Sequence, residues 1–135
     1  MRGPVVPLLH FVKGVHVPHT TVSAAIQCFN QKNLDGLMEF FDKKCVMLRD
    51  EGKDAIEGVK SLRKFLRKGF ESNPYSQVVL DEFIETGTVL MARETNSKSG
   101  SKGDKKSTQS VWVYQVCDHK IRVMHEFDVD YKASK

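Results

Sequence analysis

The amino-acid sequence predicts a single α+β domain in which helices cover one face of an antiparallel sheet. Apolar residues recur at helical spacing in the first half of the chain and alternate with polar residues in much of the second half. The chain has 135 residues, of which 40% are hydrophobic and 28% are charged. This length suffices to bury one core but not two, so we expect one folded unit.

The N-terminal segment 1–19 is interpreted as an extended arm, because prolines at positions 4, 7 and 18 interrupt a regular helix. The first acidic residue of the chain is Asp35. An acid-poor start is also typical of organelle-targeting peptides, which stay an alternative for this segment. We place the domain at 20–131 and a short tail at 132–135.

Two helices are expected next. The first begins at Thr20 or Thr21, since threonine is a good N-cap residue, and it ends at Asn30. A polar break follows, and the segment 34–44 then places apolar residues on one face. This segment predicts a second, short amphipathic helix that ends in two lysines, a favourable charge at a helix C-terminus.

A small hairpin and a third helix follow. The segment 45–58 reads as a strand, a turn at Glu51-Gly52 and a short return strand. From Val59, the run "VKSLRKFLRKGF" combines one apolar stripe with a strongly basic remainder, which predicts an amphipathic helix. Its basic surface could contact a membrane, calmodulin or RNA, or it could simply face solvent as the back of a core helix.

The rest of the chain predicts an antiparallel meander, because its apolar residues recur with period two between turn signals. The turns are expected at Thr86-Gly87, in the polar loop 96–106 and at Asp118-His119. The four strands joined by these turns are 77–85, 88–95, 107–117 and 120–130.

Three segments carry a resemblance to a known fold family. They are "FNQKNLDGLMEFFDKKCVML", "IEGVKSLRKFL" and "VWVYQVCDHKIRVMHEFD". From Thr20 to Asp128, the chain resembles the SnoaL-like or nuclear transport factor two-like superfamily, which includes ketosteroid isomerase and limonene-epoxide hydrolase. The resemblance implies a cystatin-like cone, in which a curved antiparallel sheet wraps around the N-terminal helices and encloses a central pocket. It also implies a homodimer formed through the outer sheet face.

The resemblance allows a test of two known mechanisms. The ketosteroid isomerase mechanism needs a tyrosine, a carboxylate base and a second acidic donor, but these positions hold Ala25, Arg49 and Trp112 here. That mechanism is therefore not expected. The limonene-epoxide hydrolase pattern matches better, since Arg93 takes the arginine position and Glu126 that of one acid. The second acid is replaced by Thr95, which cannot ionise.

The last strand, "KIRVMHEFDVD", alternates between two faces. One face carries Ile121, Val123, His125, Phe127 and Val129, which we assign to the dimer surface. The resemblance implies that Met124, Glu126 and Asp128, on the opposite face at mid-strand, point toward the pocket. The alternative is that this face is exposed to solvent. His125 is then a buried or interface histidine.

The predicted site combines two catalytic residues, Glu126 and Arg93, with five ligand-binding residues. The ligand-binding set is Arg49, Trp112, Tyr114, Met124 and Asp128. Apolar walls with a few convergent polar groups are typical of small-molecule sites, and arginines beside carboxylates suit an anionic or carbonyl-bearing ligand. The same charges could instead form a structural salt-bridge cluster.

Several other functions find little support. The sequence has no glycine-rich phosphate loop and no metal-spaced His/Cys set, so we expect neither a cofactor nor a metal. The net charge of +4 is modest and the lysine-rich loop 96–106 lacks aromatic residues, and both observations argue against nucleic-acid binding. Three widely spaced cysteines predict reduced thiols and a cytoplasmic location, and no apolar run is long enough to span a membrane.

Two hypotheses about function remain. In the first, the protein binds a small hydrophobic or carbonyl-containing metabolite and catalyses a cofactor-free isomerisation, dehydration, cyclisation or hydrolysis. In the second, it is a non-enzymatic dimerisation or protein-interaction module of the same fold. An open pocket favours the first hypothesis, and a pocket filled by side chains favours the second.

Overall fold

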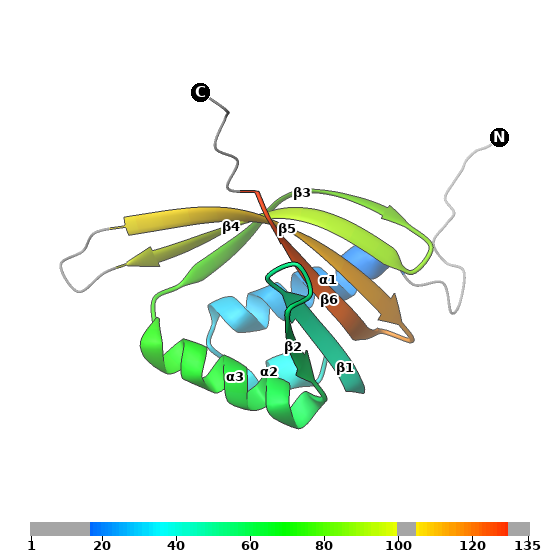
Figure 1. Cartoon of the computed structure of the whole chain (residues 1–135), viewed down its shortest axis with the longest axis horizontal. Coiled ribbons are helices and arrows are strands. Elements are labelled where there is room, and N and C mark those ends of the chain that lie inside the picture. Colours follow the sequence, from blue (N-terminus) through cyan, green and yellow to red (C-terminus); the bar gives the residue numbers. More distant parts are fainter. Residues whose placement is uncertain (1–16, 100–104, 130–135) are drawn as a thin grey trace.

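The computed structural model describes residues 17–99 and 105–129 (Figure 1). Along the chain the elements are α1 (Pro18–Asn30), α2 (Leu34–Met38), β1 (Phe41–Arg49), β2 (Asp54–Glu57), α3 (Val59–Ser72), β3 (Gln77–Thr86), β4 (Val89–Ser99), β5 (Lys105–Cys117) and β6 (Lys120–Asp128). The small hairpin, the third helix and the four-stranded meander all occur, but β4 extends to Ser99 and β5 begins at Lys105, so the predicted loop 96–106 was too long.

The described strands form one curved sheet in the order β2-β1-β6-β5-β4-β3. The α+β class, and the sheet covered by helices, are confirmed. One strand pair departs from the antiparallel pattern, because β1 runs parallel to β6 and the sheet is therefore mixed. Parallel strands need a crossover connection, and here β2, α3, β3, β4 and β5 lie between the two strands along the chain.

All three helices of the described residues lie on the same side of the sheet (Figure 1). The core between these layers includes Val22 from α1, Leu62 from α3, Leu90 from β4 and Ile121 from β6, each at most 1% exposed. Burying leucine and isoleucine side chains of this kind contributes about 1.5–3 kcal/mol each. Among the described helices, none has the length and apolar character that crossing a bilayer requires.

The start of α1 differs from the prediction. The helix begins at Pro18 rather than at Thr20 or Thr21, because proline lacks the N–H that the first turn leaves unpaired and already has a helical φ. The side chain of His19 then bonds to Glu85, with 2.7 Å between Nδ1 and Oε2, and its ring stacks on Phe83. Residues 1–16 of the predicted arm lie outside the described residues.

The second helix is also shorter than predicted. It ends at Met38, and the segment that was expected to continue it, from Phe41 to Lys44, opens strand β1 instead. Pairing of Phe41 with Ile121 of β6 draws this segment into the sheet. Tertiary pairing here overrides the helical spacing of the apolar residues.

A β-bulge changes the faces of β6. The β5–β6 register shifts between Val116, which pairs with Ile121, and Gln115, which pairs with Val123. Ile121 therefore faces the core and is 1% exposed, so its predicted place on the outer face was wrong. Beyond the bulge, Val123 and His125 face outward as predicted.

Candidate functional site

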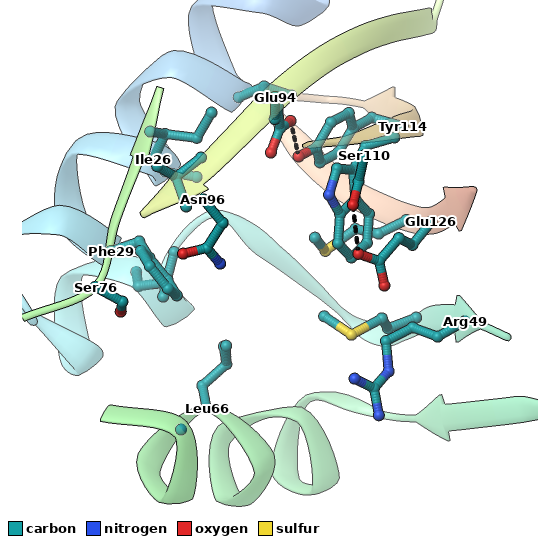
Figure 2. Close-up of a pocket in the computed structure, with 18 of the residues that line it drawn as sticks. Ile26, Phe29, Arg49, Leu66, Ser76, Glu94, Asn96, Ser110, Tyr114 and Glu126 are labelled. Carbon is teal, nitrogen blue, oxygen red and sulfur yellow. Dashed lines mark hydrogen bonds between the residues drawn. The ribbon is translucent and has the colours of Figure 1, made fainter. Parts of the chain in front are cut away.

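A cavity of about 370 Å³ lies between the helices and the concave face of the sheet (Figure 2). Its volume is within the range of small-molecule sites. Much of the wall is apolar and comes from α1, β1 and α3, with Val22, Ile26, Phe29, Met47, Phe65 and Leu66 among the lining residues. The polar lining residues come mainly from β4, β5 and β6, and these are the groups that can do chemistry.

Glu94 and Tyr114 form a buried polar pair in this cavity. Glu94 lies on β4 and is 6% exposed, while Tyr114 lies on β5 and is 3% exposed. The Tyr114 hydroxyl donates a hydrogen bond of 2.5 Å to Oε2 of Glu94 (Figure 2). This bond occupies one carboxyl oxygen of Glu94 and leaves the other oxygen available to a bound molecule.

Burial raises the pKa of the Glu94 carboxyl from 4.5 to about 7. The hydrogen bond from Tyr114 opposes this rise, and the negative charges of Glu126 and Asp81 add to it. Burial and the neighbouring Glu94 also raise the pKa of Tyr114 well above its ordinary value, so the phenol stays protonated. Glu94 is therefore present in both its neutral and its ionised form near neutral pH.

Glu126 is the second carboxyl group of the cavity. It lies on β6 opposite Trp112 of β5 and accepts a hydrogen bond of 2.9 Å from the Ser110 hydroxyl. Figure 2 shows both Glu94 and Glu126 directed toward the same open space. A cavity with two acids and an apolar wall can hold an organic molecule and exchange protons with it.

Arg49 closes the site on the β1 side. Its Nη2 lies 2.5 Å from Oδ2 of Asp54, and its guanidinium lies over the ring of Phe65, 4.6 Å from the centroid. These two contacts hold the guanidinium in place, and Figure 2 shows Arg49 at the cavity wall.

The cavity brings together most of the residues that the sequence predicted for the site. Five of them contribute to its lining: Arg49, Trp112, Tyr114, Met124 and Glu126. The alternative in which the whole polar side of β6 faces solvent is therefore wrong at mid-strand.

Arg93 and Asp128 were wrongly placed in the pocket. Arg93 lies on β4 between two buried inward residues and points to the opposite face, where it pairs with Glu82 at 3.1 Å and Asp81 at 3.7 Å. Asp128 is at the end of β6, is exposed, and does not belong to the cavity lining. Thr95 also faces outward, and its hydroxyl donates to Asp81.

Glu94 was missed because the faces of β4 were assigned in the wrong phase. In the β4–β5 ladder, Ala92 pairs with Trp112 and Glu94 pairs with Ser110. Paired residues share a face, so a pocket that holds Trp112 must hold Glu94 and exclude its neighbour Arg93. The interpretation of 96–106 as a loop hid this register, because the ladder continues to the pair Ser99 and Lys105. The available signal was that Leu90, Ala92 and Glu94 occupy every second position of β4, so that Glu94 shares the face of two apolar residues.

The described residues contain no cluster of three or more His, Cys, Asp or Glu side chains that could hold a metal. The cavity lining offers carboxyl, hydroxyl, amide and guanidinium groups.

Comparison with known proteins adds a family match. The model of a family described as "SnoaL-like domain" matches residues 22–124 of the chain, which include most of α1, all of α2 and α3, and the predicted site apart from Glu126 and Asp128. No curated protein matches the chain by sequence.

Solved structures with the same fold cover most of the chain. A cystatin-fold protein from Novosphingobium aromaticivorans is 19% identical, with a TM-score of 0.74, and the alignment covers 84% of this chain and 99% of that one. RV0760c from Mycobacterium tuberculosis, in complex with estradiol-17beta-hemisuccinate, is 14% identical, with a TM-score of 0.72 and coverage of 84% and 95%. TerC, co-crystallised with polyporic acid, is 16% identical, with a TM-score of 0.72 and coverage of 82% and 90%. At these identities the likeness concerns the fold.

Proposed function

The chain belongs to the SnoaL-like domain family, and from that premise we propose that it binds a small carbonyl compound and transfers protons on it without a cofactor. The observation that carries this proposal is the buried Glu94–Tyr114 pair in an otherwise largely apolar cavity. A carboxyl group with a pKa of about 7 can serve as an acid or a base near neutral pH. Two proteins of the same fold whose structures contain a small organic molecule support the binding of such a ligand by this chain.

The proton transfer needs only the groups of the cavity. Neutral Glu94 donates its proton to the carbonyl oxygen of the ligand, while Tyr114 holds its other carboxyl oxygen. Glu126, oriented by Ser110, accepts a proton from the carbon next to the carbonyl. The ligand becomes an enol. Glu126 then returns a proton to the same carbon, or to another carbon where a double bond is conjugated with the enol, while the enol hydroxyl returns its proton to Glu94, which completes an exchange or an isomerisation. Protons and electrons balance without an oxidant or a reductant.

The experiment follows deuterium incorporation into butyrophenone, a small ketone with exchangeable hydrogens next to its carbonyl. In D₂O, proton NMR should show faster exchange with the protein than without it. Glu126→Gln should reduce this acceleration by on the order of 100-fold, because the amide cannot accept the proton. Its melting temperature should stay nearly unchanged.

Glu82→Gln is the matched control, because Glu82 is an exposed glutamate that pairs with Arg93 outside the cavity. It should exchange butyrophenone as the wild-type protein does. Equal rates for Glu126→Gln and the wild-type protein would refute the role of Glu126. If the wild-type protein does not accelerate deuterium exchange of butyrophenone, the proposed chemistry is refuted as a whole.

The outer face of the sheet supports a second proposal, that the chain forms a homodimer. A row of mostly apolar residues crosses five strands on this face, through the paired positions Ile84, Met91, Val113, His125 and Leu48. Ile84 is 73% exposed and Met91 is 48% exposed. Nε2 of His125 is buried and has no hydrogen-bond partner among the described residues. An exposed apolar face of this kind is typical of a protein interface.

The mass of the protein in solution tests the dimer. Native mass spectrometry should give twice the chain mass, and Met91→Lys should give the single mass because a charge in the apolar row opposes burial. Tyr75→Lys is the control, since Tyr75 is 72% exposed and lies outside the strands. A single mass for the wild-type protein would contradict the dimer and would leave the cavity proposal standing.

A further inference from the structure

The cavity opens to solvent between the C-terminal half of α3 and the paired ends of β4 and β5. Of its described lining residues, Gly69, Lys98 and Thr108 are exposed, and all the others are buried or half-buried. Figure 1 shows the end of α3 that leads into β3 on the same side of the molecule as these strand ends. We call this opening, marked by Gly69, Lys98 and Thr108, the mouth of the cavity.

Two lysines lie side by side at the mouth. Lys98 of β4 lines the cavity and pairs with Lys106 of β5 in the antiparallel ladder. Both lysines are exposed, and both lie on the inward face of the sheet that also carries Glu94. Like charges directly opposite each other in a ladder are destabilising. An anion bound between the two ammonium groups would remove this repulsion.

Neither lysine takes part in an ion pair with another described residue. The ion pairs found in this part of the chain involve arginines and one histidine. The hydroxyl of Thr108 adds a donor next to the lysines, because Thr108 is the inward residue of β5 that follows Lys106. Two ammonium groups and a hydroxyl on one small area of sheet suit a carboxylate, which accepts several hydrogen bonds.

The two ends of the cavity differ in charge. Glu94 and Glu126 face its inner part, where the guanidinium of Arg49 is already paired with an acid. In Figure 2, Asn96 lies away from Arg49 and Glu126, and Lys98 follows two positions further along β4 on the same face. Over the four residues from Glu94 to Lys98 the strand rises by about 13 Å. An anionic group is therefore repelled in the inner part and attracted at the mouth.

We propose that Lys98 and Lys106 bind a carboxylate of the ligand at the mouth, at the end of the ligand that is remote from its carbonyl group. The carbonyl group then lies beside Glu94, and the apolar wall from α1 and α3 covers the chain between the two groups. This inference rests on the proposed function. It narrows the ligand class from small carbonyl compounds to keto acids whose two polar groups are well separated.

Four ketones test this inference by isothermal titration calorimetry at neutral pH and low ionic strength. Omega-benzoylheptanoate carries a carboxylate far from its ketone, omega-benzoylheptanamide is its neutral isostere, beta-benzoylpropionate carries a carboxylate close to its ketone, and butyrophenone has none. The long acid should bind about fivefold more tightly than its amide, and added salt should reduce this advantage because exposed ion pairs are screened. The short acid should gain nothing over butyrophenone, since its carboxylate would lie beside Glu94 and Glu126.

Variants of the two lysines locate the carboxylate. Lys98→Gln and Lys106→Gln should each reduce the advantage of the long acid over its amide, and the double variant should abolish it. Binding of the amide and of butyrophenone should stay unchanged. Lys60→Gln is the matched control, because Lys60 is an exposed lysine of α3 outside the cavity lining and its substitution removes the same charge. It should keep the full advantage.

The outcomes separate this inference from the proposed function. Equal binding of the long acid and its amide by the wild-type protein would overturn the carboxylate site, while accelerated exchange of butyrophenone would leave the proposed function standing. An equal loss in Lys60→Gln and Lys98→Gln would reveal an effect of net charge and would also overturn the site. An equal advantage for the short acid would contradict the separation of the two groups. Absence of butyrophenone exchange would refute the proposed function and this inference with it.

Discussion

Two neighbouring charged residues of β4 show that a charged side chain has very different surroundings on the two faces of the sheet. Glu94 faces the cavity, is 6% exposed, and has a pKa raised to about 7 by burial. Arg93 faces outward, where its side chain is 39% exposed and lies beside Asp81 and Glu82. Water screens the outer ion pairs, whereas the inner acid must be stabilised by Tyr114 or carry a proton. The inner face therefore holds the reactive chemistry.

The largest difference between the faces should appear in packing. Leu90→Ala removes a fully buried side chain from the core and should lower the free energy of unfolding by about 2–5 kcal/mol. Met91→Ala, one residue away on the outer face, should cost less than about 1 kcal/mol at concentrations that keep the chain monomeric. Urea denaturation of both variants measures this difference. Similar losses for the two would show that the faces are assigned wrongly.

The next largest effect should be the pH dependence of stability that Glu94 causes. Its pKa is about 7 in the folded protein and about 4.5 in the unfolded chain, so the folded state holds a proton that the unfolded state has lost between these values. The free energy of unfolding should fall as pH rises from about 4.5 to 7, by about 3 kcal/mol, because one pKa unit corresponds to about 1.4 kcal/mol. Below pH 4.5 both states are protonated and this contribution is constant.

Glu94→Gln should remove this part of the pH dependence, since glutamine cannot ionise. Urea denaturation at a series of pH values compares the variant with the wild-type protein. Glu82→Gln, which changes a glutamate on the outer face, is the control and should keep the wild-type slope. An unchanged slope in Glu94→Gln would mean that Glu94 is not the buried acid described here.

The smallest effect is expected at Arg93. Arg93→Gln breaks partly exposed ion pairs with Asp81 and Glu82 and should cost less than about 1 kcal/mol, with the cost falling as salt is added. Butyrophenone exchange should be unaffected because Arg93 lies outside the cavity lining. Thermal unfolding at low and high salt measures the first effect. Loss of butyrophenone exchange in Arg93→Gln would mean that Arg93 belongs to the site after all.

The order of elements could be predicted from the sequence because its signals are local. Helical spacing predicted α3 from Val59, and turn residues such as Gly52 and Gly87 marked hairpins whose strands occur in the structure. The parallel contact between β1 and β6 could not be predicted, since it depends on pairing between distant segments rather than on local pattern.

The candidate site was predicted only in part for a related reason. Trp112, Tyr114 and Glu126 lie on strands joined by a short turn, so their common face followed from alternation and the fold resemblance. The phase of β4 depended on the loop 96–106, and one residue of error exchanged Glu94 for Arg93. A slip of one residue moves every side chain of a strand to the opposite face.

The titration of Glu94 tests the central claim most directly. Carbon-13 NMR of the glutamate side-chain carboxyls, assigned by comparison with Glu94→Gln, gives the pKa of this single group. A value near 7 is expected, because burial in the cavity disfavours the charged form. A value near 4.5 would mean that water reaches the carboxylate freely, and it would contradict the assignment of Glu94 as the acid of an apolar site.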